Sequence, residues 1–262
     1  MSTMTPESAA SPTRFVATSP GEDKARMPSS KTACANCHLQ DVCLPCGMKD
    51  ADTDRLDSLT ISRRTVKCRQ PLYREGDRFQ FIYAVRSGTF KSSLLLADGR
   101  EQIGGFHIAG ELMGLDGVAD DRHASSATAL EDSVICAIPY APLSDLAAAN
   151  TSMQVSMGRM MSREIVREHS LMMLLGSMSA EERLAVFLLN LSRRLKARGY
   201  SASEFHLRMS RAEMGSYLGM KLETVSRAFS AFQRQGFIKV DKRHIRIVDP
   251  DGLARAFELR MH

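Results

Sequence analysis

The middle of the chain, from about Arg64 to Tyr140, consists of short β-type runs separated by turn residues. These runs read PLYREG, FIYAVRSG, FKSSLLLADG, EQIGGFHIAG and SVICAIPY. Turn glycines fall 12, 11 and 11 residues apart, at Gly76, Gly88, Gly99 and Gly110. Short strands closed by glycine turns at such even spacing predict a compact antiparallel barrel or sandwich.

A helical pattern follows from about Thr151 to Met178 and carries seven of the sixteen Met residues. Steps of three and four residues trace one seam along it, through Met157, Met161, Ile165, Glu168, Met172 and Leu175. Such a seam suits a two-helix coiled coil in a homodimer, and a core helix lying on the barrel would show the same period. Two Glu168 carboxylates near a dimer axis would repel each other, so we expect a marginal association.

Two capping boxes mark helix starts in the last third of the chain, where Ser179 precedes Glu182 and Ser210 precedes Glu213 by three residues. The helix after Ser210 opens a helix-turn-helix pattern, counted from Arg211 as position 1. Positions 5, 8, 9, 15 and 18 carry the small and apolar residues of that pattern: Gly215, Leu218, Gly219, Val225 and Ala228.

The second helix of this motif, about Leu222 to Gln233, presents Glu223, Ser226 and Arg227 outward near its N-terminus. Arg can bond bidentately to guanine, Glu can accept from cytosine N4, and Ser can serve either role. The later run FIKVDKRHIRIV predicts a β-hairpin with a basic tip, a wing placed to meet phosphates. We expect contacts to the DNA backbone from Ser210, Arg211, Lys221, Thr224, Lys242 and Arg243.

The distribution of charge agrees with binding to double-stranded DNA. The 262 residues carry a formal charge of +5. Residues 177–262 contain 16 Lys and Arg against 9 Asp and Glu, and the remainder contains 19 against 21. The basic surplus therefore lies entirely in the last third, as expected if that part contacts a polyanion, although a solvated helical face would also explain it.

Four of the six cysteines, Cys34, Cys37, Cys43 and Cys46, fall within thirteen residues. In a chain too large to need disulfides, such crowding indicates metal binding or redox chemistry. These four could form a tetrahedral zinc site, although the spacer of five residues is short for two zinc knuckles. Of the neighbouring candidates, Cys68 is expected to be a small core residue, and His38 a solvated loop residue.

The other segments complete the expected organisation. Residues 1–33 hold four of the nine Pro and little apolar pattern, which predicts a disordered tail. A short helix is expected near Asp52–Leu59. No apolar run approaches about 18 residues and no secretory signal is visible, so we expect a soluble cytoplasmic protein without membrane contact. No Ser-His-Asp arrangement, phosphate-binding glycine loop or H-E-x-x-H occurs, which argues against an enzyme.

Four stretches together resemble the FNR-type regulators of the CRP superfamily, a likeness that extends from Cys34 to about Val248. They are C34-x2-C37-x5-C43, ALEDSVICAIPY with Cys136, AEERLAVFLLNLSRR and LGMKLETVSRAF. The resemblance implies an α+β fold with an eight-stranded antiparallel, jelly-roll-like β-roll. The expected parts are a cluster-binding segment (34–50), a β-roll sensor domain (51–150), a dimerisation helix (151–178) and a winged helix-turn-helix domain (179–262).

The resemblance also implies an oxygen-sensing transcription factor with a four-iron, four-sulfur (4Fe–4S) cluster. The implied cluster ligands are Cys34, Cys37, Cys43 and Cys136. In this family oxygen converts the cluster to a two-iron form, the dimer dissociates and DNA binding is lost. Glu223, Ser226 and Arg227 would read an inverted repeat of TTGAT-like half-sites, and loops of the β-roll would contact RNA polymerase, with the Arg86–Lys91 turn as the candidate.

A second hypothesis is a regulator switched by a small-molecule effector, with the cysteines holding structural zinc. The cyclic-nucleotide cassette of the superfamily pairs G-E-L with an Arg beside Ser or Thr. Gly110-Glu111-Leu112 matches its first part, and Arg122-His123-Ala124-Ser125 is faintly similar to its second.

Overall fold

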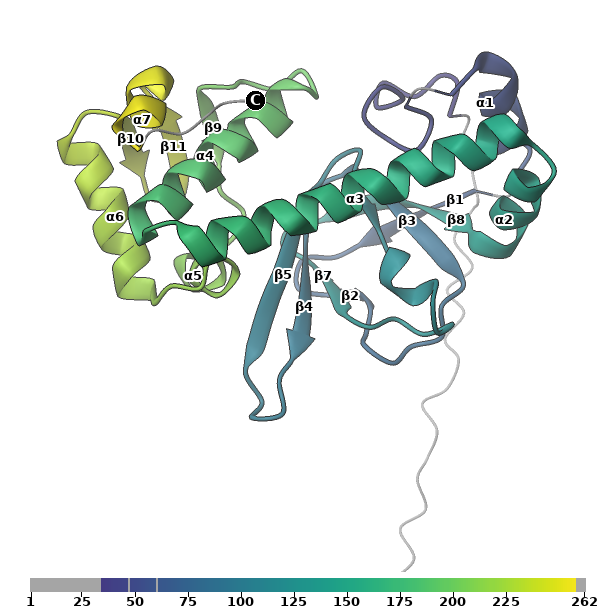
Figure 1. The fold of residues 1–262 in the computed structure, drawn as a ribbon, viewed down its shortest axis with the longest axis horizontal. Helices are drawn as coiled ribbons and strands as arrows, with labels where there is room; N and C mark the ends of the chain where they lie inside the picture. The colour runs from purple at the N-terminus through teal and green to yellow at the C-terminus, as the bar shows by residue number, and fades with distance from the viewer. Residues whose placement is uncertain (1–33, 47, 60, 258–262) are drawn as a thin grey trace, which may run out of the picture.

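The computed structural model describes residues 34–46, 48–59 and 61–257, so the tail predicted for residues 1–33 lies outside it. Figure 1 shows a β-roll and a smaller C-terminal unit at opposite ends of one long helix. None of the helices in the described ranges combines the length and the apolar character that a membrane span requires.

Eight strands form the β-roll, as two four-stranded sheets in which every pairing is antiparallel. In spatial order, one sheet contains β1 (Ser62–Val66), β8 (Ser133–Pro139), β3 (Phe81–Ser87) and β6 (Leu112–Met113). The other contains β2 (Pro71–Tyr73), β7 (Ser126–Ala129), β4 (Thr89–Leu95) and β5 (Glu101–Ile108). Side chains such as Val85, Phe90 and Ile135 fill the space between the sheets and are fully buried. The antiparallel roll predicted from the sequence is confirmed.

The helices around the roll are α1 (Asp50–Asp57), the 3₁₀ turn η1 (Leu115–Gly117), α2 (Tyr140–Ala148) and α3 (Thr151–Ser177). For α1 and α3, the predicted ends lie within two residues of the observed ends. The N-terminal half of α3 packs on the roll, because Met153, Met157 and Met160 share a core with Ile82 and Ile138. Met157 is only 8% exposed. Its predicted place in a seam between subunits is therefore wrong, since it belongs to the core of its own chain.

The C-terminal unit contains α4 (Ala180–Lys196), β9 (Glu204–His206), α5 (Arg211–Leu218), α6 (Leu222–Arg234), β10 (Ile238–Asp241), β11 (His244–Ile247) and α7 (Pro250–Ala256). Both predicted capping boxes form. Between α5 and α6, a Cβ atom on Gly215 would lie 2.5 Å from the Met220 carbonyl oxygen, and Gly219 ends α5 with a φ of 64°. A side chain at either position would therefore disturb the turn.

The C-terminal unit is docked on strand β5 of the roll. Ile103, Phe106 and Ile108 of β5 belong to the same buried cluster as the inner faces of α4, α5 and α6. Hydrogen bonds reinforce this contact, because Gln102 Nε2 donates to the Ser216 carbonyl oxygen at 2.7 Å and Ile103 N donates to Ser216 Oγ at 2.9 Å. The two units thus share a core as well as the connecting helix.

A buried carboxylate, that of Glu111 just after β5, fastens this docking. Its oxygens lie 2.8 Å from Arg194 Nε and 2.9 Å from Arg198 Nη2, both on or just after α4, and 3.7 Å from Arg167 Nη1 on α3. The Glu111 side chain is 13% exposed. Burial alone would raise its pKa, but the three arginines together lower it below the ordinary value.

We expect Glu111→Gln to lower the free energy of unfolding by about 3 kcal/mol, because it leaves buried arginines without a counter-charge. Chemical denaturation measures this change. Glu204→Gln, which removes an exposed pair with His244, is the control and should cost less than about 1 kcal/mol. The ordinary pKa of this glutamate is 4.5 and the fold lowers it. The contribution of Glu111 to stability is therefore complete above pH 4.5 and is lost as the pH falls through its lowered pKa. Equal losses in the two variants would contradict the role of Glu111.

Candidate functional site

Four cysteine thiols meet at the end of the β-roll where β1, β3 and β8 lie. Cys34, Cys37 and Cys43 come from the loop before α1, drawn in purple in Figure 1, and Cys136 comes from β8. Turn hydrogen bonds shape the loop, with Cys37 N donating to the Cys34 carbonyl oxygen at 3.1 Å. Buried Leu39 and Leu44 hold it against the roll. The sequence-predicted ligand set is therefore brought together, although its members lie up to 102 residues apart.

The same four cysteines line one small cavity with Arg86, Ile61 and Ile138. Its volume is about 20 Å³, which is room for one water molecule. Among the residues that the structure describes, no three His, Cys, Asp or Glu side chains are grouped closely enough to hold a single metal ion. The thiols thus share a cavity without converging on one point.

The remaining candidates of this region lie outside the cavity. Cys46 follows Cys43 by one turn, with its N–H bonded to the Cys43 carbonyl oxygen at 3.0 Å, but it does not line the cavity. His38 is exposed, as predicted. Cys68 is exposed in a turn after β1 and its thiol donates to the Leu130 carbonyl oxygen at 3.3 Å. The prediction of Cys68 as a core residue is therefore wrong, because the chain turns before the residue can enter the sheet.

The surroundings of three of the thiols, those of Cys34, Cys43 and Cys136, raise their pKa values. Burial raises the pKa of Cys34, and the neighbouring Asp57 carboxylate raises it further. Burial also raises the pKa values of Cys43 and Cys136, while the charges of Arg198 and Arg86 oppose the two shifts. Binding a metal at these thiols must therefore release protons.

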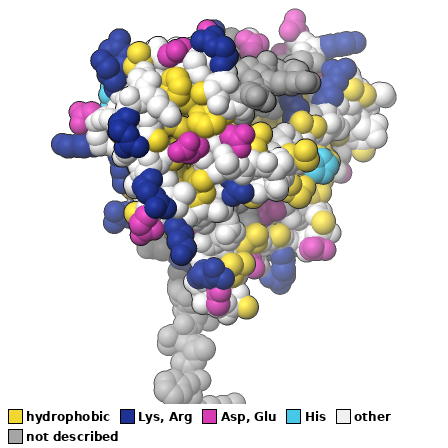
Figure 2. Space-filling model, turned by 60° about the vertical axis from the view of Figure 1, so that its left-hand side comes forward, with side chains coloured by type: hydrophobic (Ala, Val, Ile, Leu, Met, Phe, Trp, Pro, Cys, Tyr) yellow, Lys and Arg dark blue, Asp and Glu magenta, His cyan; other side chains and the backbone are white. Residues whose placement is uncertain are grey.

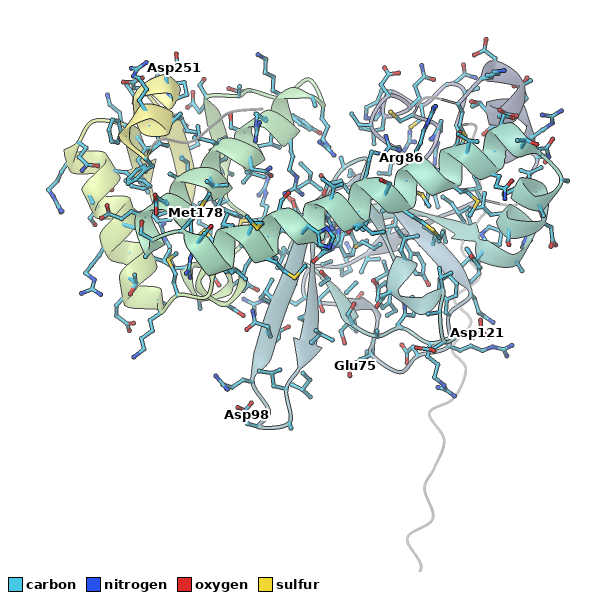
Figure 3. All side chains as sticks on the ribbon, viewed as in Figure 1. Glu75, Arg86, Asp98, Asp121, Met178 and Asp251 are labelled. Carbon is cyan, nitrogen blue, oxygen red and sulfur yellow. The ribbon has the colours of Figure 1, made fainter. Side chains whose placement is uncertain are left out.

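Sequence reasoning assigned the Arg86–Lys91 turn to RNA polymerase and missed the contact that Arg86 makes inside the molecule. Arg86 Nη1 donates to Cys37 Sγ at 3.3 Å (Figure 3). Further along the turn, Thr89 and Phe90 are buried, and Lys91 pairs with Glu101 at 2.8 Å. Ser87 is the exposed side chain of the segment 86–91. The turn therefore offers little surface to a partner protein.

The cysteine loop also touches the segment that carries Glu111. A Cβ atom on Gly110 would lie 2.7 Å from Val42 Cγ2, so only glycine allows the loop to pack this closely. At its other end, Cys34 N and Ala35 N donate to the Asp57 carboxylate at the end of α1. The loop is thus fastened both to α1 and to the segment that holds the C-terminal unit.

The residues of the possible effector cassette are engaged within the protein. Glu111 is paired with arginines, as described above. Ser125 donates both its N–H and its hydroxyl to Asp116 Oδ2 at 2.8 Å, and Arg122 Nη1 donates to the Gly76 carbonyl oxygen at 2.7 Å. The Asp116 carboxylate therefore occupies the Ser125 donors and a backbone carbonyl engages Arg122, which disfavours a phosphate-bearing effector at this place.

Helix α6 presents to solvent the side chains that the sequence predicts to contact DNA bases. Glu223 and Arg227 are exposed and Ser226 is half-buried, while the opposite face of the helix is buried. Arg227 Nη2 contacts Thr224 Oγ1 at 3.4 Å, which holds the guanidinium along the helix surface. Figure 2 brings this end of the molecule forward and shows Lys and Arg side chains along its left edge.

The predicted backbone contacts divide into two groups. Lys221 at the start of α6 and Lys242 and Arg243 at the hairpin tip are exposed. Ser210 is committed to its capping box, and Arg211 stacks over the Phe229 ring at 3.2 Å. Those two side chains point into the protein, so the structure presents the wing and the start of α6 as the basic surface.

The C-terminal half of α3 presents an exposed apolar face. Ile165 is 55% exposed and Met172 is 60% exposed, with Glu168 between them at 52%. Met161 and Leu175 are half-buried at the margin of this face. Five of the six predicted seam residues are therefore accessible at least in part, and the acid interrupts the apolar surface as expected.

We expect Arg227→Ala to weaken binding to an inverted-repeat duplex by about 1–3 kcal/mol and to relax the preference at one base pair. Fluorescence anisotropy with a panel of single-base variants measures both effects. Lys242→Ala is the matched control and should weaken binding to every duplex alike, because a phosphate contact carries no sequence information. Equal losses for Arg227→Ala on specific and random DNA would falsify its role in base reading.

We expect Glu168→Ala to strengthen dimerisation in air about fivefold, because it removes about 1 kcal/mol of repulsion between like charges. Sedimentation equilibrium measures the dissociation constant. Glu181→Ala, an exposed acid outside α3, should leave it unchanged. An unaltered monomer–dimer equilibrium in Glu168→Ala would count against a dimer face centred on this residue.

Comparison with known proteins places both units. The model of the Crp-like helix-turn-helix domain matches residues 182–256, and that of the Cyclic nucleotide-binding domain matches residues 63–150. The chain is 46% identical to the transcriptional regulatory protein btr of Bordetella pertussis, over 87% of this chain and 95% of that one. It is 40% identical to the fumarate and nitrate reduction regulatory protein of Escherichia coli, over 85% and 89%. The structure of FixK2 from Bradyrhizobium japonicum matches with a TM-score of 0.70 and 31% identity, over 77% and 99%.

Proposed function

The chain belongs to the CRP/FNR family of transcription regulators, and we propose that it is an oxygen-responsive member whose DNA-binding dimer depends on a 4Fe–4S cluster. Helix-turn-helix regulators of this family bind DNA and typically act as dimers. The oxygen response, the cluster, the TTGAT-like inverted repeat and the contact with RNA polymerase are the proposed parts.

One observation carries the proposal: Cys34, Cys37, Cys43 and Cys136 line a common cavity, and Cys46 does not. A zinc site built from the four crowded cysteines would need Cys46 and would leave Cys136 unused. The observed set instead takes three thiols from one loop and the fourth from a strand of the roll. Four cysteine thiolates are the usual ligands of a 4Fe–4S cluster, which spreads its ligands over separate irons.

The residues present fit such a group by their chemistry. The four thiols are the required donors, and Arg86 supplies a cationic hydrogen-bond donor beside Cys37. The cavity measures about 20 Å³, so a cluster held by these four thiols would need more room than the loop leaves here. When bound, the cluster supplies a redox-active centre that dioxygen can oxidise.

The contacts of the loop offer a route by which its position can affect DNA binding. Val42 packs against Gly110, and the next residue, Glu111, holds Arg194 and Arg198 of the C-terminal unit. The same carboxylate faces Arg167 on α3, close to Glu168 in the exposed face. Displacement of the loop therefore bears on both the docking of the DNA-binding unit and the dimer helix.

We expect Cys136→Ser to abolish the cluster and Cys46→Ser to leave it intact, because Cys136 lines the cavity and Cys46 does not. Anaerobic reconstitution followed by iron and acid-labile sulfide analysis should give about four of each per chain for wild type and Cys46→Ser. Thermal unfolding of the metal-free variants controls for misfolding. Colourless protein with one zinc per chain that is lost in Cys46→Ser would overturn the proposal in favour of a zinc site.

A further inference from the structure

Three arginines lie close enough to interact with Cys37, Cys43 or Cys136, and they come from different parts of the fold. Arg86 lies at the end of β3, Arg63 on β1, and Arg198 just after α4. An acid, Asp57, also lies at the site and accepts hydrogen bonds from the loop backbone at Cys34 and Ala35. Arg198 is already paired with Glu111. In the described part of the chain, no carboxylate forms an ion pair with Arg86 or Arg63, which leaves these two as the unneutralised cations of the site.

Arg86 stands between the loop and the roll. Its guanidinium donates to Cys37 Sγ at 3.3 Å, and it lines the cavity together with Cys136. Arg86 also makes a side-chain hydrogen-bond interaction with the Cys136 thiol. One guanidinium thus interacts with two ligands from segments that are 99 residues apart.

Arg63 reaches the site by the register of the sheet. It is the direct partner of Cys136 in the antiparallel pairing of β1 with β8, and such partners project from the same face. Its Nε is buried and has no hydrogen-bond partner within the described residues. A buried cationic donor without a partner is costly unless an anion lies nearby. The adjacent Arg64 points to the other face, where it stacks over the Phe81 ring at 4.6 Å.

We propose that Arg86 and Arg63 are positioning residues that hold an anionic thiolate-ligated cluster and limit its oxidation by dioxygen, an inference that rests on the proposed function. The donor of Arg63 would gain the anion that it lacks, and Arg86 would tie the loop to β8 through its contacts with both ligands. Neither residue would be a ligand of the irons.

The expected effect follows from the charge that changes on oxidation. Dioxygen that takes one electron from the site becomes superoxide, and the site becomes one unit less negative. A nearby cation stabilises the more negative state and so opposes the loss of the electron. Removing that cation should therefore make the site easier to oxidise.

The test compares Arg86→Gln, Arg63→Gln and Arg86→Lys with Arg64→Gln, an arginine on the same strand that faces away from the thiols. The readouts are iron and sulfide per chain after anaerobic reconstitution, the rate of bleaching in air-saturated buffer, and thermal unfolding of the metal-free proteins. We expect Arg86→Gln and Arg63→Gln to bleach about tenfold faster than wild type or to hold less iron. Arg86→Lys, which keeps the charge, should lie between Arg86→Gln and wild type, and Arg64→Gln should match wild type.

The outcomes separate this inference from the function on which it rests. Wild type without iron and sulfide would overturn both. Wild type with a full cluster, together with Arg86→Gln and Arg63→Gln that load and bleach as wild type does, would overturn only the role of the arginines. If either Arg86→Gln or Arg63→Gln unfolds, the iron content and bleaching rate of the other variant still test the proposal. Equally fast bleaching in Arg64→Gln would also contradict the proposed role of Arg86 and Arg63, because the effect would then depend on the net charge of the protein and not on the position of the arginine.

Discussion

The carboxylate of Glu111 is the constraint on which the arrangement of the molecule depends. A charge buried to this extent is tolerated only with counter-charges in place, and Glu111 finds them on α4 and α3 while its own segment belongs to the roll. Its neighbour Gly110 lies under Val42 of the cysteine loop. Two consecutive residues, Gly110 and Glu111, therefore contact the loop, the long helix and the DNA-binding unit. The path of contacts from the cysteine loop to the C-terminal unit is therefore short.

The long helix has two halves with different roles. Its N-terminal half is buried against the roll by Met153, Met157 and Met160, which fix it to the roll. Its C-terminal half is apolar but open to solvent, and Glu168 interrupts that face. A face of this kind associates weakly, and weak association can be shifted by a modest change in free energy. The proposed regulation requires this property, because a tight dimer would not respond to the state of a distant cluster.

Much of the fold could be predicted from the sequence, because it follows local rules. Glycine spacing predicted an antiparallel barrel or sandwich, the family resemblance predicted the roll, and capping boxes predicted the starts of α4 and α5. Strands β1, β6 and β7 escaped prediction. Strands β6 and β7 are only two and four residues long, and the SATA of β7 lacks large apolar side chains. Met157 and Cys68 were misplaced because periodicity reports a helix face or a strand without naming the surface that covers it. The roles of Arg86 and Glu111 depend on contacts across 49 and 83 residues, which single-sequence patterns do not carry.

We propose that one cysteine site controls DNA binding through the dimer. The most direct measurement is a titration of an inverted-repeat duplex with one anaerobic preparation, before and after exposure to air, with sedimentation of the same samples. The account predicts tight binding by a dimer before exposure, and weaker binding with dissociation to monomers afterwards. Restored binding on anaerobic reconstitution would complete the cycle. Equal affinity and an unchanged dimer in both samples, while the iron is lost, would contradict it.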